Sequence, residues 1–260
     1  MWEATLNISR RQSLKGFAAA AASPSIGLAA RHRLAPPIRL VVLDVGGTIV
    51  EDRGDVPDAL RSALGSHGID ASTEEIRRRR GASKREVVRY FVDRQSLPRN
   101  VDRDKLTVRI YDEFSANVIR AYQSVPPING AENAIRQMRQ NGYSLATTTG
   151  FDRAITMSIF RRLGWDQYFA AIICSDDVVQ GRPSPFMLFH AMESARVDSV
   201  AEVVAVGDTP LDLQAGTNAG LRGVVGVLSG VSTAENLRRE PHTHIVPSVA
   251  NLSALLSSQF

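Results

Sequence analysis

The stretch LVVLDVGGTIVED, residues 40–52, decides the fold because it joins an apolar run to a polar, glycine-containing turn. The apolar run over residues 38–43 has the length and composition of a buried β-strand. Asp44 follows it directly, and Gly46 and Gly47 then favour a tight turn. A lone carboxylate at the end of a buried strand indicates a nucleophile or a metal ligand.

Apolar runs alternate with helical patterns along the chain from residue 130 onward. We expect further strands at residues 143–147, 170–174, 202–206 and 223–228. Each of these runs follows a segment with helical periodicity, so the pattern indicates consecutive βαβ units. The sequence therefore predicts an α/β fold whose core is a Rossmann-like parallel sheet.

Residues 55–124 differ from the rest, because they contain amphipathic helical patterns and no convincing strand. We expect helices at residues 55–68, 72–80, 83–95 and 104–123. An all-helical insert after the first strand suggests a cap over the carboxyl edge of the sheet. We therefore expect a core of residues 38–54 and 125–260 and a helical cap of residues 55–124.

The first 37 residues resemble an export signal, with charges followed by a mildly apolar stretch and small residues. The pair Arg10-Arg11 lies in a context that resembles a twin-arginine leader. We expect export to the periplasm through residues 1–37. The alternative is a disordered N-terminus on a cytoplasmic protein.

The composition restricts the kinds of partner. Residues 1–37 hold five basic residues against one acid, which accounts for the whole net charge of +4 and gives no argument for nucleic-acid binding by the remainder. No run outside that segment reaches the ~18 apolar residues of a membrane span, so we expect no stable membrane insertion. Cys174, the single cysteine, excludes an intrachain disulfide and predicts a buried strand thiol. A homodimer stays open.

Polar residues follow three of the expected strands. The first strand ends at Asp44, the second runs into Thr149 and Gly150, and another ends in the stretch GDTPLD at residues 207–212. Ligands of open α/β sheets bind beyond the carboxyl ends of the strands, so we expect these residues to share one site.

The stretch GDTPLD suits the start of a helix. Thr209 fits the N-cap and Pro210 the first helical position. Asp208 and Asp212 then face the same way, one helical turn apart. With Asp44 they form a set of oxygen ligands of the kind that Mg²⁺ prefers.

The order of these residues resembles the haloacid dehalogenase superfamily of phosphohydrolases, over about residues 38–258. The resemblance implies that Asp44 is a nucleophile that forms an aspartyl-phosphate, and that Arg182 in GRPSP offsets its charge. It implies Mg²⁺ as the cofactor and a small anionic organophosphorus compound as the substrate. The implied phosphate-binding residues are Gly47, Thr48, Thr149 and Gly150, and the implied metal-site residues are Asp44, Gly46, Asp208 and Asp212.

The sequence departs from ordinary phosphatases of this superfamily at Gly46, where they have a second Asp that acts as general acid and base. A lysine in the expected cap offers one replacement. Ser83 and Glu86 form a capping-box pattern that makes Lys84 the first residue of a helix. The helix dipole and neighbouring arginines would lower the pKa of Lys84, which favours imine formation with a carbonyl.

A small residue at Gly46 together with Gly81-x-x-Lys84 resembles the phosphonatase-like group of the superfamily. In that group the lysine forms a Schiff base with an aldehyde, which allows a C–P bond to break. The resemblance implies hydrolysis of a small organophosphonate such as phosphonoacetaldehyde, with Lys84 as a catalytic residue. Two positions depart from the group's pattern, namely Val87 in place of a histidine and Arg80 in place of a methionine.

Three alternatives stay open. The chain could be a phosphatase of small phosphate monoesters whose acid is Glu51, Asp52 or a cap residue. Dehalogenation of a haloacid is a second alternative, which the intact GDTPLD opposes. The third is a catalytically decayed domain that only binds a ligand.

Overall fold

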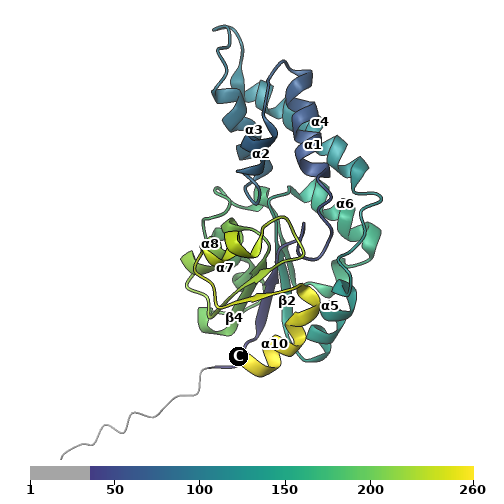
Figure 1. Ribbon diagram of the computed structural model, residues 1–260, viewed down its shortest axis with the longest axis vertical. Coiled ribbons are helices and arrows are strands. Elements are labelled where there is room, and N and C mark those ends of the chain that lie inside the picture. Colours follow the sequence, from purple (N-terminus) through teal and green to yellow (C-terminus); the bar gives the residue numbers. More distant parts are fainter. Residues whose placement is uncertain (1–35) are drawn as a thin grey trace, which may run out of the picture. The chain divides into compact units, whose positions relative to one another are not determined.

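A parallel six-stranded sheet lies at the centre of the computed structural model, which describes residues 36–260 (Figure 1). The strands are β1 (Leu40–Leu43), β2 (Ser144–Thr148), β3 (Ala171–Ile173), β4 (Val203–Gly207), β5 (Gly223–Val227) and β6 (His244–Val246). Their order is β3-β2-β1-β4-β5-β6, and every neighbouring pair is parallel. This confirms the predicted α/β fold. The expected export leader lies outside the described residues except for its last two positions.

Helices cover both faces of the sheet (Figure 1). They are α5 (Ala131–Gln140), α6 (Arg153–Leu163), α7 (Phe186–Ser194), α8 (Pro210–Asn218), α9 (Ala234–Arg238) and α10 (Leu252–Gln259). Leu40 and Val42 of β1 pack into the cluster that contains α7 and α8, whereas Val41 and Leu43 pack into the cluster with α5 and α10. Because both faces are buried, β1 is apolar at every position rather than alternating.

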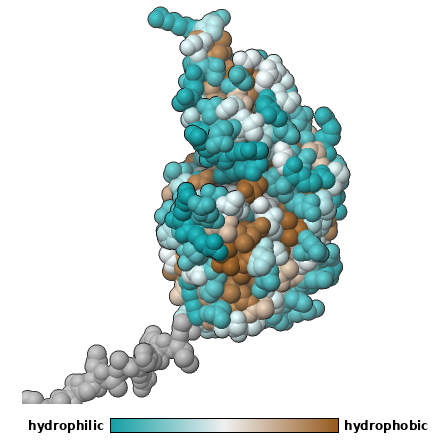
Figure 2. Space-filling model, viewed as in Figure 1, coloured by the Kyte–Doolittle hydropathy of each residue, from teal (hydrophilic) through white to brown (hydrophobic). Residues whose placement is uncertain are grey.

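A helical region is inserted after β1, in the upper part of Figure 1. It consists of α1 (Asp55–Ser66), α2 (Thr73–Arg77), α3 (Lys84–Asp93) and α4 (Arg103–Ala121). Leu64, Val88 and Phe114 are fully buried between these helices. The outward faces of these helices are polar, and Figure 2 shows a mainly hydrophilic surface over this region. The four helices fall within the residues expected for the cap.

Five strands were expected, and each corresponds to one of β1 to β5. The sixth, β6, was not expected as a strand, because three half-buried residues at the sheet edge make too short a pattern. Short 3₁₀ helices complete the described fold at Asp166–Tyr168, Ser175–Asp177, Val200–Glu202 and Val249–Asn251. Within residues 36–260, no helix is both long and apolar enough to cross a membrane.

Candidate active site

Asp44 lies directly beyond the carboxyl end of β1, where β1 adjoins β4. Its backbone N–H donates to the carbonyl of Val206 at 2.9 Å, which extends the β1–β4 ladder by one residue. The strand order reverses between β1 and β4, and open α/β sheets bind ligands at this place. The side chain is only 6% exposed.

The guanidinium of Arg182 joins two of the predicted acids. Its Nη1 lies 2.8 Å from Asp44 Oδ1 and 2.6 Å from Asp212 Oδ1, and all three side chains are more than nine-tenths buried. Its Nη2 donates to the carbonyl and hydroxyl oxygens of Thr148, each at 2.8 Å. Buried charges are stable when they are paired and hydrogen-bonded, so Arg182 offsets the negative charge of Asp44.

The loop after β4 gives Asp208 and Asp212 different surroundings. Thr209 is the N-cap of α8 and Pro210 is its first residue, as predicted. Asp212 Oδ2 accepts hydrogen bonds from the backbone N–H and the hydroxyl of Thr209, while its Oδ1 pairs with Arg182. Both oxygens of Asp212 are therefore engaged, whereas Asp208 Oδ1 is buried without a hydrogen-bond partner.

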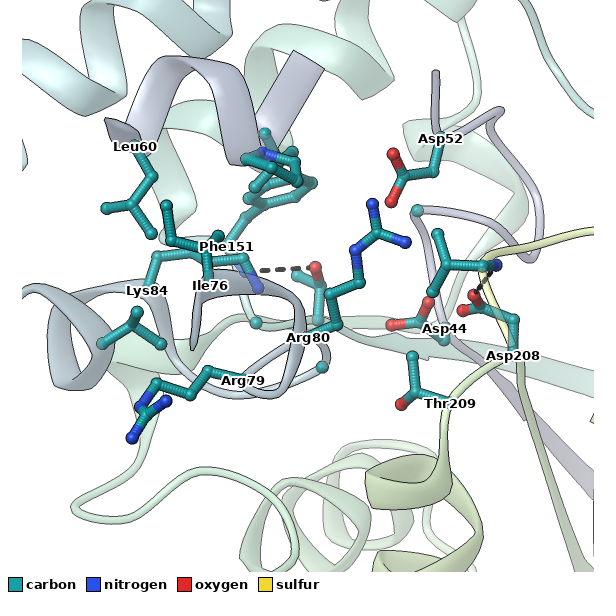
Figure 3. Close-up of a pocket in the computed structure, with 18 of the residues that line it drawn as sticks. Asp44, Asp52, Leu60, Ile76, Arg79, Arg80, Lys84, Phe151, Asp208 and Thr209 are labelled. Atoms are coloured by element: carbon teal, nitrogen blue, oxygen red, sulfur yellow. Dashed lines mark hydrogen bonds between the residues drawn. The ribbon is translucent and has the colours of Figure 1, made fainter. Parts of the chain in front are cut away.

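A cavity of about 60 Å³ lies between this edge of the sheet and the inserted helices (Figure 3). Both the core and the helical region contribute to its lining. The predicted site residues in the lining are Asp44, Gly46, Lys84, Thr149, Gly150, Arg182 and Asp208. Three other predicted residues, Gly47, Thr48 and Asp212, do not line it.

Gly47 and Thr48 contribute to the structure beneath the cavity. Gly47 has a φ of 82°, and a Cβ at this position would lie 2.5 Å from Asp208 Oδ2, so a larger residue does not fit. The same Asp208 oxygen accepts a hydrogen bond from the N–H of Val231 at 2.8 Å. Thr48 is fully buried and its hydroxyl has no partner. The structure therefore places Gly47 against Asp208 and Thr48 in the interior, and neither residue lines the cavity.

Asp44, Asp208 and Asp212 offer carboxylate oxygens that lie within 4.8 Å of one another. Burial raises the pKa of Asp44 to about 6, although Arg182 acts in the opposite direction. Burial also raises the pKa of Asp208 well above its ordinary value, and the charges of Asp44 and Asp212 add to this effect. Mg²⁺ fits this set, since Asp208 Oδ1 has no other partner and Gly46 presents its backbone at the same cavity.

Lys84 is the first residue of α3, as predicted, but the hydrogen bonds at the N-terminus of this helix differ from the expected ones. The side chain of Ser83 caps no backbone N–H, so the predicted capping box is wrong. The N–H of Lys84 donates instead to the carbonyl of Gly150 at 3.1 Å. Glu86 Oε1 accepts from the N–H of Gly181 at 3.2 Å. Both interactions link the helical region to the core.

The amine of Lys84 lies inside the cavity, where Nζ donates to the carbonyl of Ala82 at 2.9 Å (Figure 3). The ring centroid of Phe151 lies 5.7 Å from it. Burial lowers the pKa of Lys84 to about 8, and Arg182 adds to this effect while Asp44 opposes it. The pKa is thus lowered as predicted, but the largest cause is burial rather than the helix dipole or neighbouring arginines.

Gly81 lets the loop before α3 approach the core closely. Its φ is 84°, and a Cβ there would lie 2.5 Å from Thr209 Oγ1. In the same loop, the carbonyl oxygen of Ala82 would lie 2.6 Å from a Cβ on Gly150. The loop that carries Lys84 therefore packs against the loops that follow both β4 and β2.

Two aromatic side chains occupy the space beside Gly46. A Cβ at this position would lie 3.7 Å from Tyr122 Oη and 3.9 Å from a ring carbon of Phe151. The two rings pack edge to face, with centroids 5.5 Å apart. Asp52 also lines the cavity, whereas Glu51 does not. Sequence reasoning missed Tyr122 and Phe151, because each looks like an ordinary core aromatic in its local pattern.

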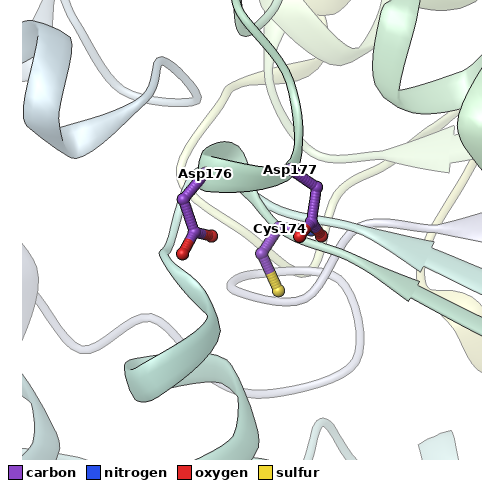
Figure 4. Close-up of side chains that lie close together, drawn as sticks. All are labelled: Cys174, Asp176 and Asp177. Carbon is purple, nitrogen blue, oxygen red and sulfur yellow. The ribbon is translucent and has the colours of Figure 1, made fainter.

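A second group of ligand-type side chains lies beyond β3, where Cys174, Asp176 and Asp177 approach one another (Figure 4). Asp177 Oδ2 pairs with Arg153 at 2.6 Å and accepts the backbone N–H of Cys174 at 2.7 Å. Asp176 accepts the backbone N–H of Arg153. Burial raises the pKa of the Cys174 thiol to about 11, so it stays protonated at neutral pH. These interactions make the cluster a structural one.

Several known proteins are similar to this chain in sequence or in fold. A phosphonoacetaldehyde hydrolase of Syntrophobacter fumaroxidans is 28% identical over 234 residues, which cover 86% of this chain and 84% of that protein. One from Latilactobacillus sakei is 28% identical over 208 residues, or 75% of this chain and 77% of that protein. The fold matches a phosphonoacetaldehyde hydrolase-like protein of Oleispira antarctica at a TM-score of 0.74 and 22% identity, covering 86% and 92% of the two chains.

The profile described as haloacid dehalogenase-like hydrolase matches residues 38–220, which is most of the chain. The matched residues include the inserted helices, the strand ends that carry Asp44 and Asp208, and the loop before α7 that carries Arg182. The chain belongs to the haloacid dehalogenase-like hydrolases.

Proposed function

We propose that this hydrolase cleaves the C–P bond of a small organophosphonate such as phosphonoacetaldehyde, with Mg²⁺ as its cofactor. One observation carries the proposal: Lys84 and Asp44 line the same small cavity, so an amine of lowered pKa and a carboxylate nucleophile can reach one compact substrate. The names of the similar phosphonoacetaldehyde hydrolases support the same chemistry. In this proposal residues 55–124 act as the cap that carries Lys84.

The reaction begins at Lys84. Its neutral amine attacks the carbonyl carbon of the substrate, and loss of water gives a protonated imine. The carboxylate of Asp44 then attacks phosphorus, and the electron pair of the C–P bond moves toward the imine nitrogen to form an enamine. Water hydrolyses the aspartyl-phosphate, while the enamine takes up a proton and is hydrolysed. The products are phosphate, acetaldehyde and free Lys84, with one water consumed overall.

The other site residues handle charge and position. Arg182 holds Asp44 in place and reduces its repulsion of an anionic phosphonate. Thr149 accepts the N–H of Phe151 at its hydroxyl oxygen and presents that hydroxyl at the cavity, where it can donate to a phosphoryl oxygen. Asp44, Asp208 and the carbonyl of Gly46 would hold Mg²⁺, which would supply further positive charge for the phosphoryl group. Electron withdrawal by the imine makes a second Asp at Gly46 unnecessary.

The proposal is tested by phosphate release from phosphonoacetaldehyde with Mg²⁺. We expect turnover that stops with a chelator and in Asp44→Asn, which keeps the shape of the side chain but removes the nucleophile. Asp176→Asn, at the structural cluster beyond β3, is the matched control and should retain turnover. No phosphonate turnover by the wild type, at any Mg²⁺ concentration, would contradict the proposal.

Asp52 favours a second candidate, a phosphatase of small monoesters. Its side chain lines the cavity, so it could protonate a leaving alcohol without an acid at Gly46. This candidate predicts turnover of phosphate esters that Asp52→Asn reduces by about 100-fold or more, within the range of general acid catalysis. If neither phosphonates nor phosphate esters are hydrolysed, a binding domain that has lost its activity becomes the better account.

A further inference from the structure

The cationic side chain of Arg80 lines the active-site cavity, and no acidic residue of the described chain pairs with it. The residue lies between α2 and Gly81, and it lines the cavity together with Asp44 and Lys84 (Figure 3). Its Nε is buried and has no hydrogen-bond partner. Asp44 and Asp52 line the same cavity, yet Arg80 forms no ion pair with any residue in the described part of the chain.

The neighbouring arginines have other roles. Arg79 stacks over the ring of Tyr90, 3.4 Å from its centroid, and donates to the carbonyl of Glu75 at 2.8 Å. Arg78 pairs with Glu74 on the surface at 3.1 Å. Arg79 also lines the cavity, but its guanidinium is engaged in these contacts, so Arg80 is the member of the run that brings an unpaired guanidinium to the site. Partial burial of an unpaired guanidinium is unfavourable, so this position favours an anion that arrives with the substrate.

The position of Arg80 indicates which part of the substrate this anion belongs to. The phosphoryl group is attacked by Asp44 from the core, where Arg182 is already engaged with two carboxylates. Arg80 and Lys84 both come from the helical region and enter the cavity from the cap. An anion that Arg80 binds can therefore belong to the organic part of the substrate, whose carbonyl group would react with Lys84. A planar guanidinium complements a planar carboxylate through paired hydrogen bonds.

We propose that Arg80 is a specificity-determining residue that binds a carboxylate on the carbonyl-bearing part of the substrate. We base this on the proposed function, and it makes compact phosphonates whose carbonyl carbon also bears a carboxylate better substrates than phosphonoacetaldehyde, which lacks that group. The cavity of about 60 Å³ restricts the substrate to a small molecule. The C–P cleavage steps are unchanged, and the products become phosphate and an α-keto acid, with one water consumed.

A pair of unreactive ligands tests this inference. 3-Phosphonopropionate carries a carboxylate, propylphosphonate does not, and neither has a carbonyl group that could form an imine. Calorimetric titration in the presence of Mg²⁺ should show that the wild type binds 3-phosphonopropionate about 10-fold to 100-fold more tightly, as expected for a charge-assisted pair. In Arg80→Met, which keeps the length of the side chain, the two affinities should differ by less than about 2-fold.

Two further variants control for general effects. Arg77→Met removes an exposed charge from the same run and should keep the preference for the carboxylate. Arg80→Lys keeps the positive charge and should keep part of the preference for the carboxylate. Thermal unfolding shows whether each variant is folded. Equal affinities in the wild type, no binding of 3-phosphonopropionate, or a preference that survives in Arg80→Met would overturn the inference. A preference that depends on Arg80 in a chain that hydrolyses no phosphonate would contradict the proposed function alone.

Discussion

The amine of Lys84 must lose its proton before it can attack a carbonyl, so its pKa should govern the pH dependence of turnover. This pKa is lowered from 10.5 to about 8, mainly by burial and also by Arg182, while Asp44 and Asp52 act in the opposite direction. The neutral amine increases as pH rises through that value. We expect kcat/KM for phosphonoacetaldehyde to increase with pH up to about 8 and then level off. A profile that is flat or falls across this range would contradict the role of Lys84 as the attacking amine.

For Lys84, the sequence correctly predicted its position at the start of a helix but not the hydrogen bonds around it. A Ser-x-x-Glu pattern correctly marks the start of α3, but Glu86 bonds to the core at Gly181 rather than to its own helix. A contact between the helical region and the core takes the place of the expected hydrogen bond within the helix. A local sequence pattern carries no information about such long-range contacts. The direction of Arg80 is hidden for the same reason, because four consecutive arginines look alike in sequence.

The loop that joins α2 to α3 brings the inserted helical region into contact with the core. Gly81→Ala should disturb this loop in two ways. The φ of 84° is unfavourable for alanine, and the new Cβ would lie 2.5 Å from Thr209 Oγ1. We expect kcat/KM to fall by about 10-fold or more, which corresponds to a misplacement of Lys84. Steady-state kinetics of the purified variant measure this effect.

Gly68→Ala is the matched control for that substitution. Gly68 also has a positive φ, 73°, but a Cβ there would have open space around it. We expect a loss of roughly 1 kcal/mol of stability from the backbone strain alone, with kcat/KM unchanged. Equal losses of kcat/KM in both variants would show that the close approach of Gly81 to Thr209 has no role in the site.

The elements that the sequence predicted best are those whose pattern is set by burial. Strands β1 to β5 are short apolar runs within a sheet covered on both faces, and the inserted helices α1 to α4 have a clear apolar stripe. Asp44, Thr149 and Asp208 were found because the ends of parallel strands meet at one edge. Tyr122 was missed, since it reaches Gly46 only through the packing of α4 against the core.

The folded protein contains an acidic cluster, and a divalent cation bound there should stabilise the folded state. Asp208 is almost completely buried, its Oδ1 has no partner, and Asp44 and Asp212 lie close by. At a Mg²⁺ concentration about 100 times the Kd, binding stabilises the fold by about 2.7 kcal/mol. For a protein of this size we expect Tm to rise by roughly 5–10 °C. Calorimetric or fluorescence-monitored unfolding measures the change.

Asp208→Asn provides the control for this expectation. Without Mg²⁺ the variant should be at least as stable as the wild type, because it removes a buried charge from the cluster. With Mg²⁺ it should show little increase in Tm. An unchanged Tm of the wild type in saturating Mg²⁺ would contradict the assignment of these acids as a metal site.

In the proposed reaction, Lys84 forms an imine with a substrate held at Asp44. Treatment of the wild type with phosphonoacetaldehyde and borohydride would reduce that imine to a stable amine, and mass spectrometry of the digested chain would locate it. The chain has three lysines, Lys15, Lys84 and Lys105, so the assignment is direct. We predict a single adduct on the peptide that contains Lys84, absent in Lys84→Arg and retained in Lys105→Arg. Phosphonate turnover that persists in Lys84→Arg, with no adduct on the wild type, would contradict the account.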